Sequence, residues 1–139
     1  MNIYKISGPF DIPVHKGKGG KFIGDEQVQE FWNTHPQFRK RRGCYIFGVK
    51  APRGYSPGYV GKAAKTFEQE VFTLHKLNHY HGFLADYGKG KPVMFFILSP
   101  RQRGKPNASQ ITEVERYLIE LASTANEDLR NVRDITPPS

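Results

Sequence analysis

The sequence predicts an α+β fold, in which a small, mainly antiparallel central sheet is flanked by helices. Short apolar stretches at residues 43–50, 57–62 and 92–98 are bounded by glycine and proline, which is typical of strands. Residues 66–81 and 110–125 carry apolar side chains at the 3.6-residue period of a helix. The order strand, strand, helix, strand, helix therefore predicts a sheet with helices packed on it.

The chain of 139 residues is long enough for one domain with a real core. Residues 43–135 hold the predicted core elements, and residues 1–42 are expected to be an N-terminal strand and helix extension packed on that core. Residues 136–139, TPPS, are expected to form a loose tail. The sequence therefore predicts one domain overall.

Three segments are expected within the N-terminal extension. Residues 1–6 predict a short strand, which a Gly-Pro pair then breaks. Residues 15–22, HKGKGGKF, predict a flexible basic loop. Residues 25–35 predict a helix that has Asp25 as its N-cap and is ended by Pro36.

The charge balance indicates a polyanionic partner. The 21 basic and 13 acidic residues give a formal net charge of +8, and a balance of this size favours nucleic acid. Cations gather in RKRR at residues 39–42 and in the loop SPRQRGKPN at residues 99–107. We expect DNA ahead of RNA, and the simpler alternative is a soluble basic protein.

The chain carries no mark of secretion or of membrane insertion. Its one cysteine, Cys44, cannot form an internal disulfide. The first ten residues lack the apolar core of a signal peptide, and no apolar run approaches the roughly 20 residues that span a bilayer. A cytoplasmic protein without a membrane partner is therefore expected.

One carboxylate of the last helix lies on the apolar side. On a helical wheel Glu115 falls at the edge of the arc formed by Ile111, Val114, Leu118, Leu121 and Ala122, and Ser109 is the expected N-cap. Burying a carboxylate without a partner is costly. Glu115 therefore predicts a nearby cation, metal ion or donor cluster, and a structural salt bridge is the alternative.

The preceding helix repeats this feature. Glu70 lies within its apolar arc, whereas Lys76 is expected to point elsewhere. Carboxylate oxygens suit Mg²⁺ or Mn²⁺, so Glu70 and Glu115 are both candidate metal ligands. An ion pair with a nearby lysine or arginine is the alternative for Glu70.

Two histidines on this helix have the spacing of metal ligands. His75 and His79 are one helical turn apart. Because no third ligand is evident in the sequence, a solvated pair is the simpler interpretation.

The first two predicted strands carry a paired motif, GCY at residues 43–45 and YVGKA at residues 59–63. This pair resembles the motif of the GIY-YIG nuclease superfamily, whose small sheet is flanked by helices in the same order. Glu115 in EVERYLIELA and Asn131 in NEDLRN stand where that family has a metal-binding Glu and an Asn. The resemblance covers about residues 43–131.

The resemblance implies a metal-dependent endonuclease that hydrolyses phosphodiester bonds. Glu115 would hold Mg²⁺ or Mn²⁺ beside the scissile phosphate, and Asn131 would orient groups there. Tyr45 would be the general base, directly or through water, and Tyr59 would support the geometry of the nucleophile. A phenol has a pKa near 10, so Tyr45 needs a cation, for which Lys62 is the candidate. Ordinary strand packing is the alternative for both tyrosines.

The sequence departs from the family at one charged position. Early in the helix after the second motif, Glu70 stands where the family has an arginine that stabilises transition-state charge. Another cation, such as Lys62, Lys76 or an arginine of residues 99–107, could replace that arginine, or Glu70 could add a metal ligand. Otherwise the chain is a catalytically degenerate nucleic-acid-binding module, or a structural protein whose basic surface meets an acidic partner.

Overall fold

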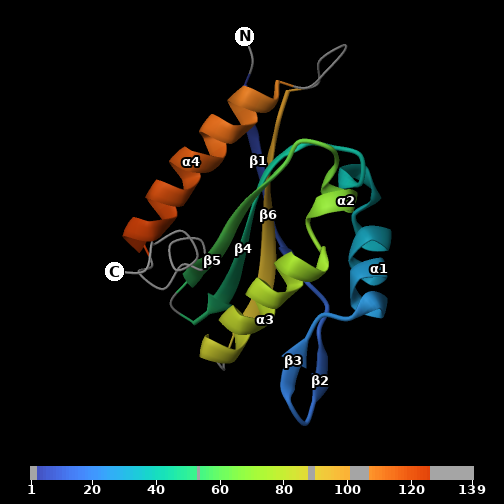
Figure 1. Ribbon diagram of the computed structural model, residues 1–139. Coiled ribbons are helices and arrows are strands. Elements are labelled where there is room, and N and C mark those ends of the chain that lie inside the picture. Colours follow the sequence, from blue (N-terminus) through green and yellow to red (C-terminus); the bar gives the residue numbers. More distant parts are fainter. Residues whose placement is uncertain (1–2, 53, 88–89, 101–106, 126–139) are drawn as a thin grey trace.

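The central feature of the fold is a four-stranded antiparallel sheet (Figure 1). A computed structural model describes residues 3–52, 54–87, 90–100 and 107–125. In spatial order the sheet holds β1 (Lys5–Asp11), β6 (Lys91–Leu98), β4 (Gly43–Ala51) and β5 (Gly54–Ala63). The predicted α+β class with an antiparallel sheet is confirmed.

Helices cover both faces of this sheet (Figure 1). Side chains alternate along a strand, so Tyr45 and Phe47 of β4 face one layer while Cys44 and Ile46 face the other. The first layer contains α1 (Asp25–Thr34), the 3-10 turn η1 (Pro36–Phe38), α2 (Phe67–Glu70) and α3 (Leu74–Tyr87). The second layer is α4 (Ala108–Ala125), whose Ile111 packs on Cys44.

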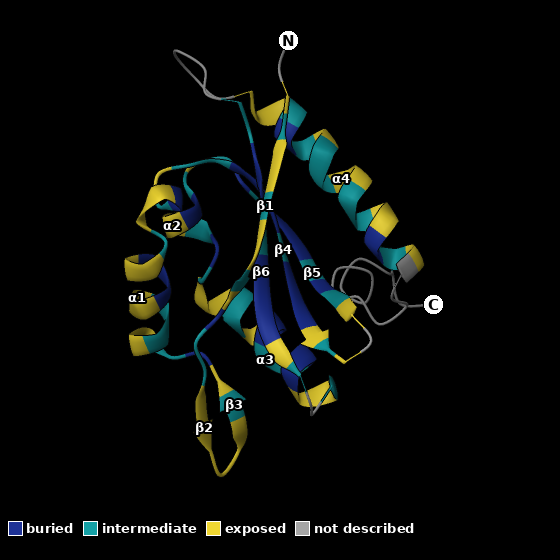
Figure 2. Ribbon diagram, turned by 180° about the vertical axis from the view of Figure 1, so that it is seen from behind, coloured by how far each residue is buried: buried dark blue, intermediate teal, exposed yellow. Residues whose placement is uncertain are grey.

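The N-terminal residues supply part of the core. Strand β1 pairs with β6 at the edge of the sheet. Helix α1 buries Phe31 and Trp32, and the Trp32 ring stacks on Phe96 of β6 with centroids 6.1 Å apart. Figure 2 shows that the buried residues concentrate in the central strands. None of the helices in the described ranges combines the length and the apolar character that a membrane span needs.

Two predictions for the N-terminal segment are wrong. Strand β1 continues through the Gly-Pro pair, because an irregularity in its register between Ser7 and Phe10 accommodates the proline at the sheet edge. The expected basic loop is instead a hairpin of β2 (His15–Gly17) and β3 (Gly20–Phe22), which projects from the body (Figure 1). Its strands pair only with each other, so its side chains are mostly exposed.

The helix starts also differ from the prediction. Gly24, not Asp25, is the N-cap of α1, and its N–H donates to the Gln27 side chain at 2.9 Å. At α4, Asn107 rather than Ser109 caps the helix, because its Oδ1 accepts from the Gln110 N–H at 3.0 Å. These changes shift each start by one or two residues and leave the helices in place.

Candidate functional site

The two motif strands pack through a tyrosine and a glycine. Tyr45 of β4 is paired with Gly61 of β5. A Cβ atom added to Gly61 would lie 2.2 Å from Cζ of Tyr45, so only glycine leaves room for this ring. Tyr59 lies beside it, with ring centroids 6.4 Å apart. The glycine of YVG is therefore explained by close packing on the tyrosine.

A break between α2 and α3 brings a lysine over that tyrosine. The predicted continuous helix is wrong here, because α2 ends at Glu70 and α3 begins only at Leu74. The change of direction carries Lys76 onto the Tyr45 ring, where its Nζ lies 5.8 Å from the ring centroid. The helical wheel pointed Lys76 elsewhere because it assumed a continuous helix.

Thr73 could have revealed this break. Its Oγ1 accepts weakly from the Lys76 N–H at 3.4 Å, and its carbonyl accepts from the Leu77 N–H at 2.8 Å, as at a helix N-terminus. Threonine is among the residues preferred at the N-cap of a helix. Reading it as an N-cap would have placed Lys76 in the first turn of α3.

Helix α4 contributes a carboxylate to the same cluster. Lys62 Nζ of β5 donates to Thr112 Oγ1 at 3.1 Å, and Glu115 follows three residues later on the same side of α4. Glu115 is half-buried. Burial raises the pKa of its carboxyl group, while the positive charges of Lys62 and Lys76 oppose that rise. Both lysines are therefore close enough to act on Glu115.

The hydroxyl of Tyr45 lies deep in this cluster. Burial raises the pKa of Tyr45 far above its ordinary value, and the charges of Tyr59, Glu70 and Glu115 add to the effect. Tyr80 beside it partly offsets that rise, but donates its own proton to the Val71 carbonyl at 2.6 Å. The Tyr45 hydroxyl itself has no partner at normal hydrogen-bond geometry among the described atoms. Tyr45 therefore stays protonated at neutral pH, which argues against direct proton abstraction by it.

Glu70 lies at the rim of the cluster. Its Oε2 accepts from the Lys65 N–H at 3.2 Å, and its charge acts on Tyr45 and Lys76. Burial lowers the pKa of Lys76, and Glu70 and Glu115 partly restore it. We name Tyr45, Tyr59, Lys62, Lys76 and Glu115, with Glu70 at their rim, the tyrosine–lysine cluster.

The donor set of this cluster suits a shared rather than an enclosed cation. No group of three His, Cys, Asp or Glu side chains that could hold a metal ion occurs within the described ranges. Glu115 offers carboxylate oxygens, and Mg²⁺ is commonly bound through one or two carboxylates together with substrate phosphate. Glu115 and Glu70 carry oxygen atoms of the kind that such a shared ion would need.

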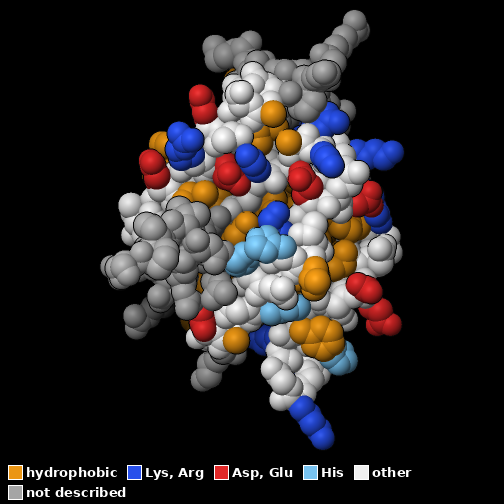
Figure 3. Space-filling view, in the orientation of Figure 1, with side chains coloured by type: hydrophobic (Ala, Val, Ile, Leu, Met, Phe, Trp, Pro, Cys, Tyr) orange, Lys and Arg blue, Asp and Glu red, His pale blue; other side chains and the backbone are white. Residues whose placement is uncertain are grey.

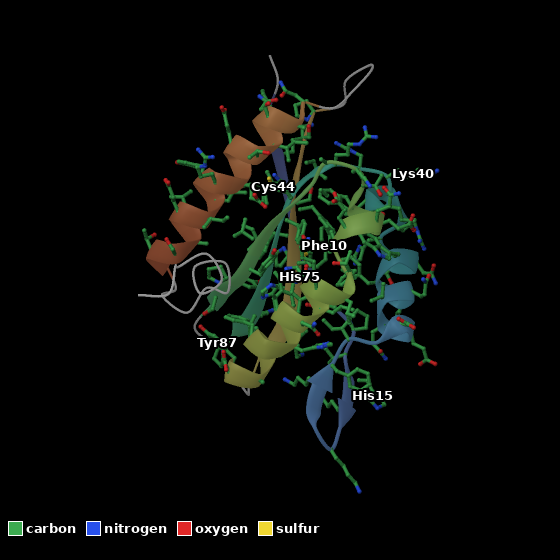
Figure 4. The ribbon with its side chains drawn as sticks, in the orientation of Figure 1. Phe10, His15, Lys40, Cys44, His75 and Tyr87 are labelled. Carbon is green, nitrogen blue, oxygen red and sulfur yellow. The ribbon has the colours of Figure 1, made fainter. Side chains whose placement is uncertain are left out.

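Three of the four basic side chains in the RKRR run bond to other segments of the protein. Arg39 binds Glu68 and the Asn33 side chain. Arg41 donates to the Ser99 carbonyl and Arg42 to the Lys65 carbonyl. Lys40 is exposed (Figure 4). These arginines tie the start of β4 to the segments that follow β5 and β6.

Two sets of predicted residues lie outside the described ranges. Asn131 is one of them, and the other consists of the basic residues of the 99–107 loop, Arg101, Arg103 and Lys105. The remaining predicted site residues, Tyr45, Tyr59, Lys62, Glu70 and Glu115, come together with Lys76, which the sequence offered as a candidate cation but placed on another side of its helix. Figure 3 shows basic and histidine side chains near the middle of the face that carries α3.

The resemblance to GIY-YIG nucleases stays a prediction that rests on these residues. No protein-family model, no curated protein and no solved structure matches the chain.

Proposed function

We propose that this chain hydrolyses phosphodiester bonds of nucleic acid at the tyrosine–lysine cluster, with a divalent cation bound by Glu115. The observation that carries the proposal is one half-buried carboxylate on which two lysines from different elements act, beside two tyrosines of the paired motif. Separate elements supply these groups, and strand packing alone gives no reason for the charged ones.

The lysines are suited to hold a phosphate group. Lys76 is half-buried, so its charge is less screened than that of a surface lysine. Lys62 is fixed by its hydrogen bond to Thr112. Donors held in position before the reaction stabilise the charge that develops on phosphate oxygens without reorganising. In this proposal Lys76 does the work for which the family uses an arginine.

The remaining groups orient the reaction. A divalent cation, when bound, would neutralise phosphate charge and make a bound water more acidic. Glu115 contributes the protein ligand. Tyr59 is partly exposed and can reach a substrate, whereas Tyr45 is fully buried and holds the strands and Lys76 in place. We therefore assign the contact with the nucleophile to Tyr59 and a positioning role to Tyr45.

The projecting hairpin favours a duplex substrate. Lys16 and Lys18 are exposed on it, and residues 12–24 contain three lysines and no acidic residue. A two-stranded ribbon fits the major groove of DNA. The hairpin joins α3 through the Ile23 N–H, which donates to His81 at 3.0 Å. A duplex that contacts Lys76 could therefore extend along α3 to the hairpin.

The second candidate function is nucleic-acid binding without cleavage on the same fold. It is favoured by the burial of the Tyr45 hydroxyl and by the lack of a three-ligand metal group in the described part of the chain. Both functions predict binding, so only a cleavage assay separates them.

A cleavage assay with matched variants tests the proposal. The full chain is incubated with supercoiled plasmid DNA and with single-stranded RNA, in Mg²⁺, in Mn²⁺ or in a chelator. Glu115→Gln should abolish metal-dependent cleavage, whereas Glu113→Gln, an exposed change on the same helix, should leave it intact. Equal activity of the two variants would rule out the role of Glu115. Binding without cleavage by the wild-type chain would establish the second function.

A further inference from the structure

Two histidines at the start of α3 form an arrangement that the proposed reaction does not use. His75 and His79 are one turn apart, and their Nε2 atoms lie 3.3 Å from each other. His75 is exposed in the first turn of the helix (Figure 4), and His79 is buried beneath it. The ring of Tyr59 stacks on His79, with centroids 4.9 Å apart and an angle of 19° between the planes.

The separation of the two nitrogens matches that of ligands on one metal ion. Zn–N bonds of about 2.0–2.1 Å in a tetrahedral site put two nitrogens about 3.3–3.4 Å apart. The two ring nitrogens also lie within reach of a weak direct hydrogen bond, in which one ring donates to the other. The observed 3.3 Å therefore fits an ion shared by the two rings without any change in their separation, and in the absence of an ion the rings can contact each other directly.

We propose that His75 and His79 bind a transition-metal ion, with Zn²⁺ as the expected occupant. Imidazole nitrogen suits zinc, copper and nickel, whereas Mg²⁺ prefers oxygen. Stacking on Tyr59 restricts the ring of His79, so one ligand is held in place before the ion binds. Exposure of His75 provides access from solvent.

The site is open on its remaining sides. No third His, Cys, Asp or Glu among the described residues completes a metal group. Water or an oxygen anion must therefore fill the other positions of the ion. Because Tyr59 contacts both His79 and Tyr45, the ion lies next to the tyrosine–lysine cluster. The zinc site does not depend on the proposed reaction, since binding alone tests it.

Calorimetric titration of the full chain with ZnCl₂ tests this inference. We expect one zinc ion per chain, and at least tenfold weaker binding after His75→Ala. His75 is exposed, so its removal should leave the fold intact. His15→Ala is the matched control, because His15 is an exposed histidine on the hairpin. That control should bind zinc like the wild type.

Cobalt gives a second measurement. Co²⁺ should produce the visible absorption of a low-coordinate ion with nitrogen ligands, and the double variant His75→Ala/His79→Ala should lose it. MgCl₂ in excess should not displace the cobalt. The inference fails if the wild-type chain binds neither ion, or if His75→Ala binds zinc as tightly as His15→Ala does.

Discussion

Two groups of cations in this protein have opposite surroundings. In the run Arg39–Arg42 the three arginines bond to carbonyl, amide and carboxylate oxygens of neighbouring segments. Lys62 and Lys76 instead lie half-buried near Glu115. Lys62 donates to the Thr112 hydroxyl, and the ammonium group of Lys76 lies over the Tyr45 ring. The denser cluster of charge in the sequence thus bonds within the fold, and the two scattered lysines are the ones that we propose to meet a ligand.

This difference shows that charge density in a sequence does not tell which cations are already bonded within the fold. An arginine already bonded to a carbonyl must exchange that bond to bind phosphate, which offsets much of the gain. A lysine held near a desolvated carboxylate loses less on binding, because phosphate and a shared cation can join the existing charges. Substitution of the lysines should therefore lower activity, whereas substitution of the arginines should lower stability.

The largest expected effect is on cleavage. Lys76→Ala should lower the rate by about a hundredfold or more, as removal of a donor aimed at developing charge typically does. Lys62→Ala should cost less, because in our proposal Lys76 rather than Lys62 does the work of the family arginine. Lys40→Ala, an exposed change in the basic run, is the control. Initial rates on plasmid DNA measure all three, and similar rates for the Lys76 and Lys40 variants would contradict the comparison.

The next effect is on the salt dependence of binding. Each phosphate contact contributes roughly 0.9 to the slope of log affinity against log salt on duplex DNA. Replacing Lys16 and Lys18 of the hairpin by alanine should therefore lower that slope by up to about 1.8. Arg42→Ala should leave the slope unchanged, since that side chain bonds to Lys65. Fluorescence anisotropy at several salt concentrations measures it, and the reverse pattern would make the basic run the binding surface.

A smaller effect is expected on stability. Arg42→Ala should lower the free energy of unfolding by about 1 kcal/mol, because it removes a hydrogen bond between the start of β4 and the segment after β5. Lys40→Ala should change it by less than about 0.5 kcal/mol, as is usual on the surface. Urea denaturation followed by circular dichroism compares the two. Equal stability would show that the arginine contacts do not support the fold.

The smallest expected effect depends on pH. Burial raises the pKa of Glu115, so the folded protein holds this proton more tightly than the unfolded chain. The ionised carboxylate then opposes folding, and this opposition grows as the pH rises from the usual glutamate pKa through the raised value. Glu115→Gln should therefore melt at a higher temperature than the wild type at pH 7, and the difference should shrink towards pH 4.

Thermal melts at the two pH values measure this difference. Glu113→Gln is the matched control and should show no such gain, because Glu113 is exposed. A lower melting temperature for Glu115→Gln at pH 7 would mean that the carboxylate stabilises the fold, as a structural salt bridge does.

The sequence was sufficient to predict the fold class because periodicity reports which side of an element is buried. It identified Glu115 by the same reasoning, since a carboxylate on an apolar arc stands out. It predicted the wrong orientation for the Lys76 side chain, because a helical wheel assumes one continuous helix and α2 and α3 are separate helices. It could not predict the bonds that the RKRR arginines make within the protein, because their partners, such as Ser99 and Glu68, are distant in the chain.

The packing of Tyr45 against Gly61 has a consequence for the use of such motifs. A tyrosine on one strand and the glycine opposite it form a steric pair, which serves the packing of this chain whether or not it cuts a substrate. A pattern search built on these letters therefore selects proteins by shape. Selection by chemistry would have to test for Lys62, Lys76 and Glu115, whose charges the packing of the strands does not require.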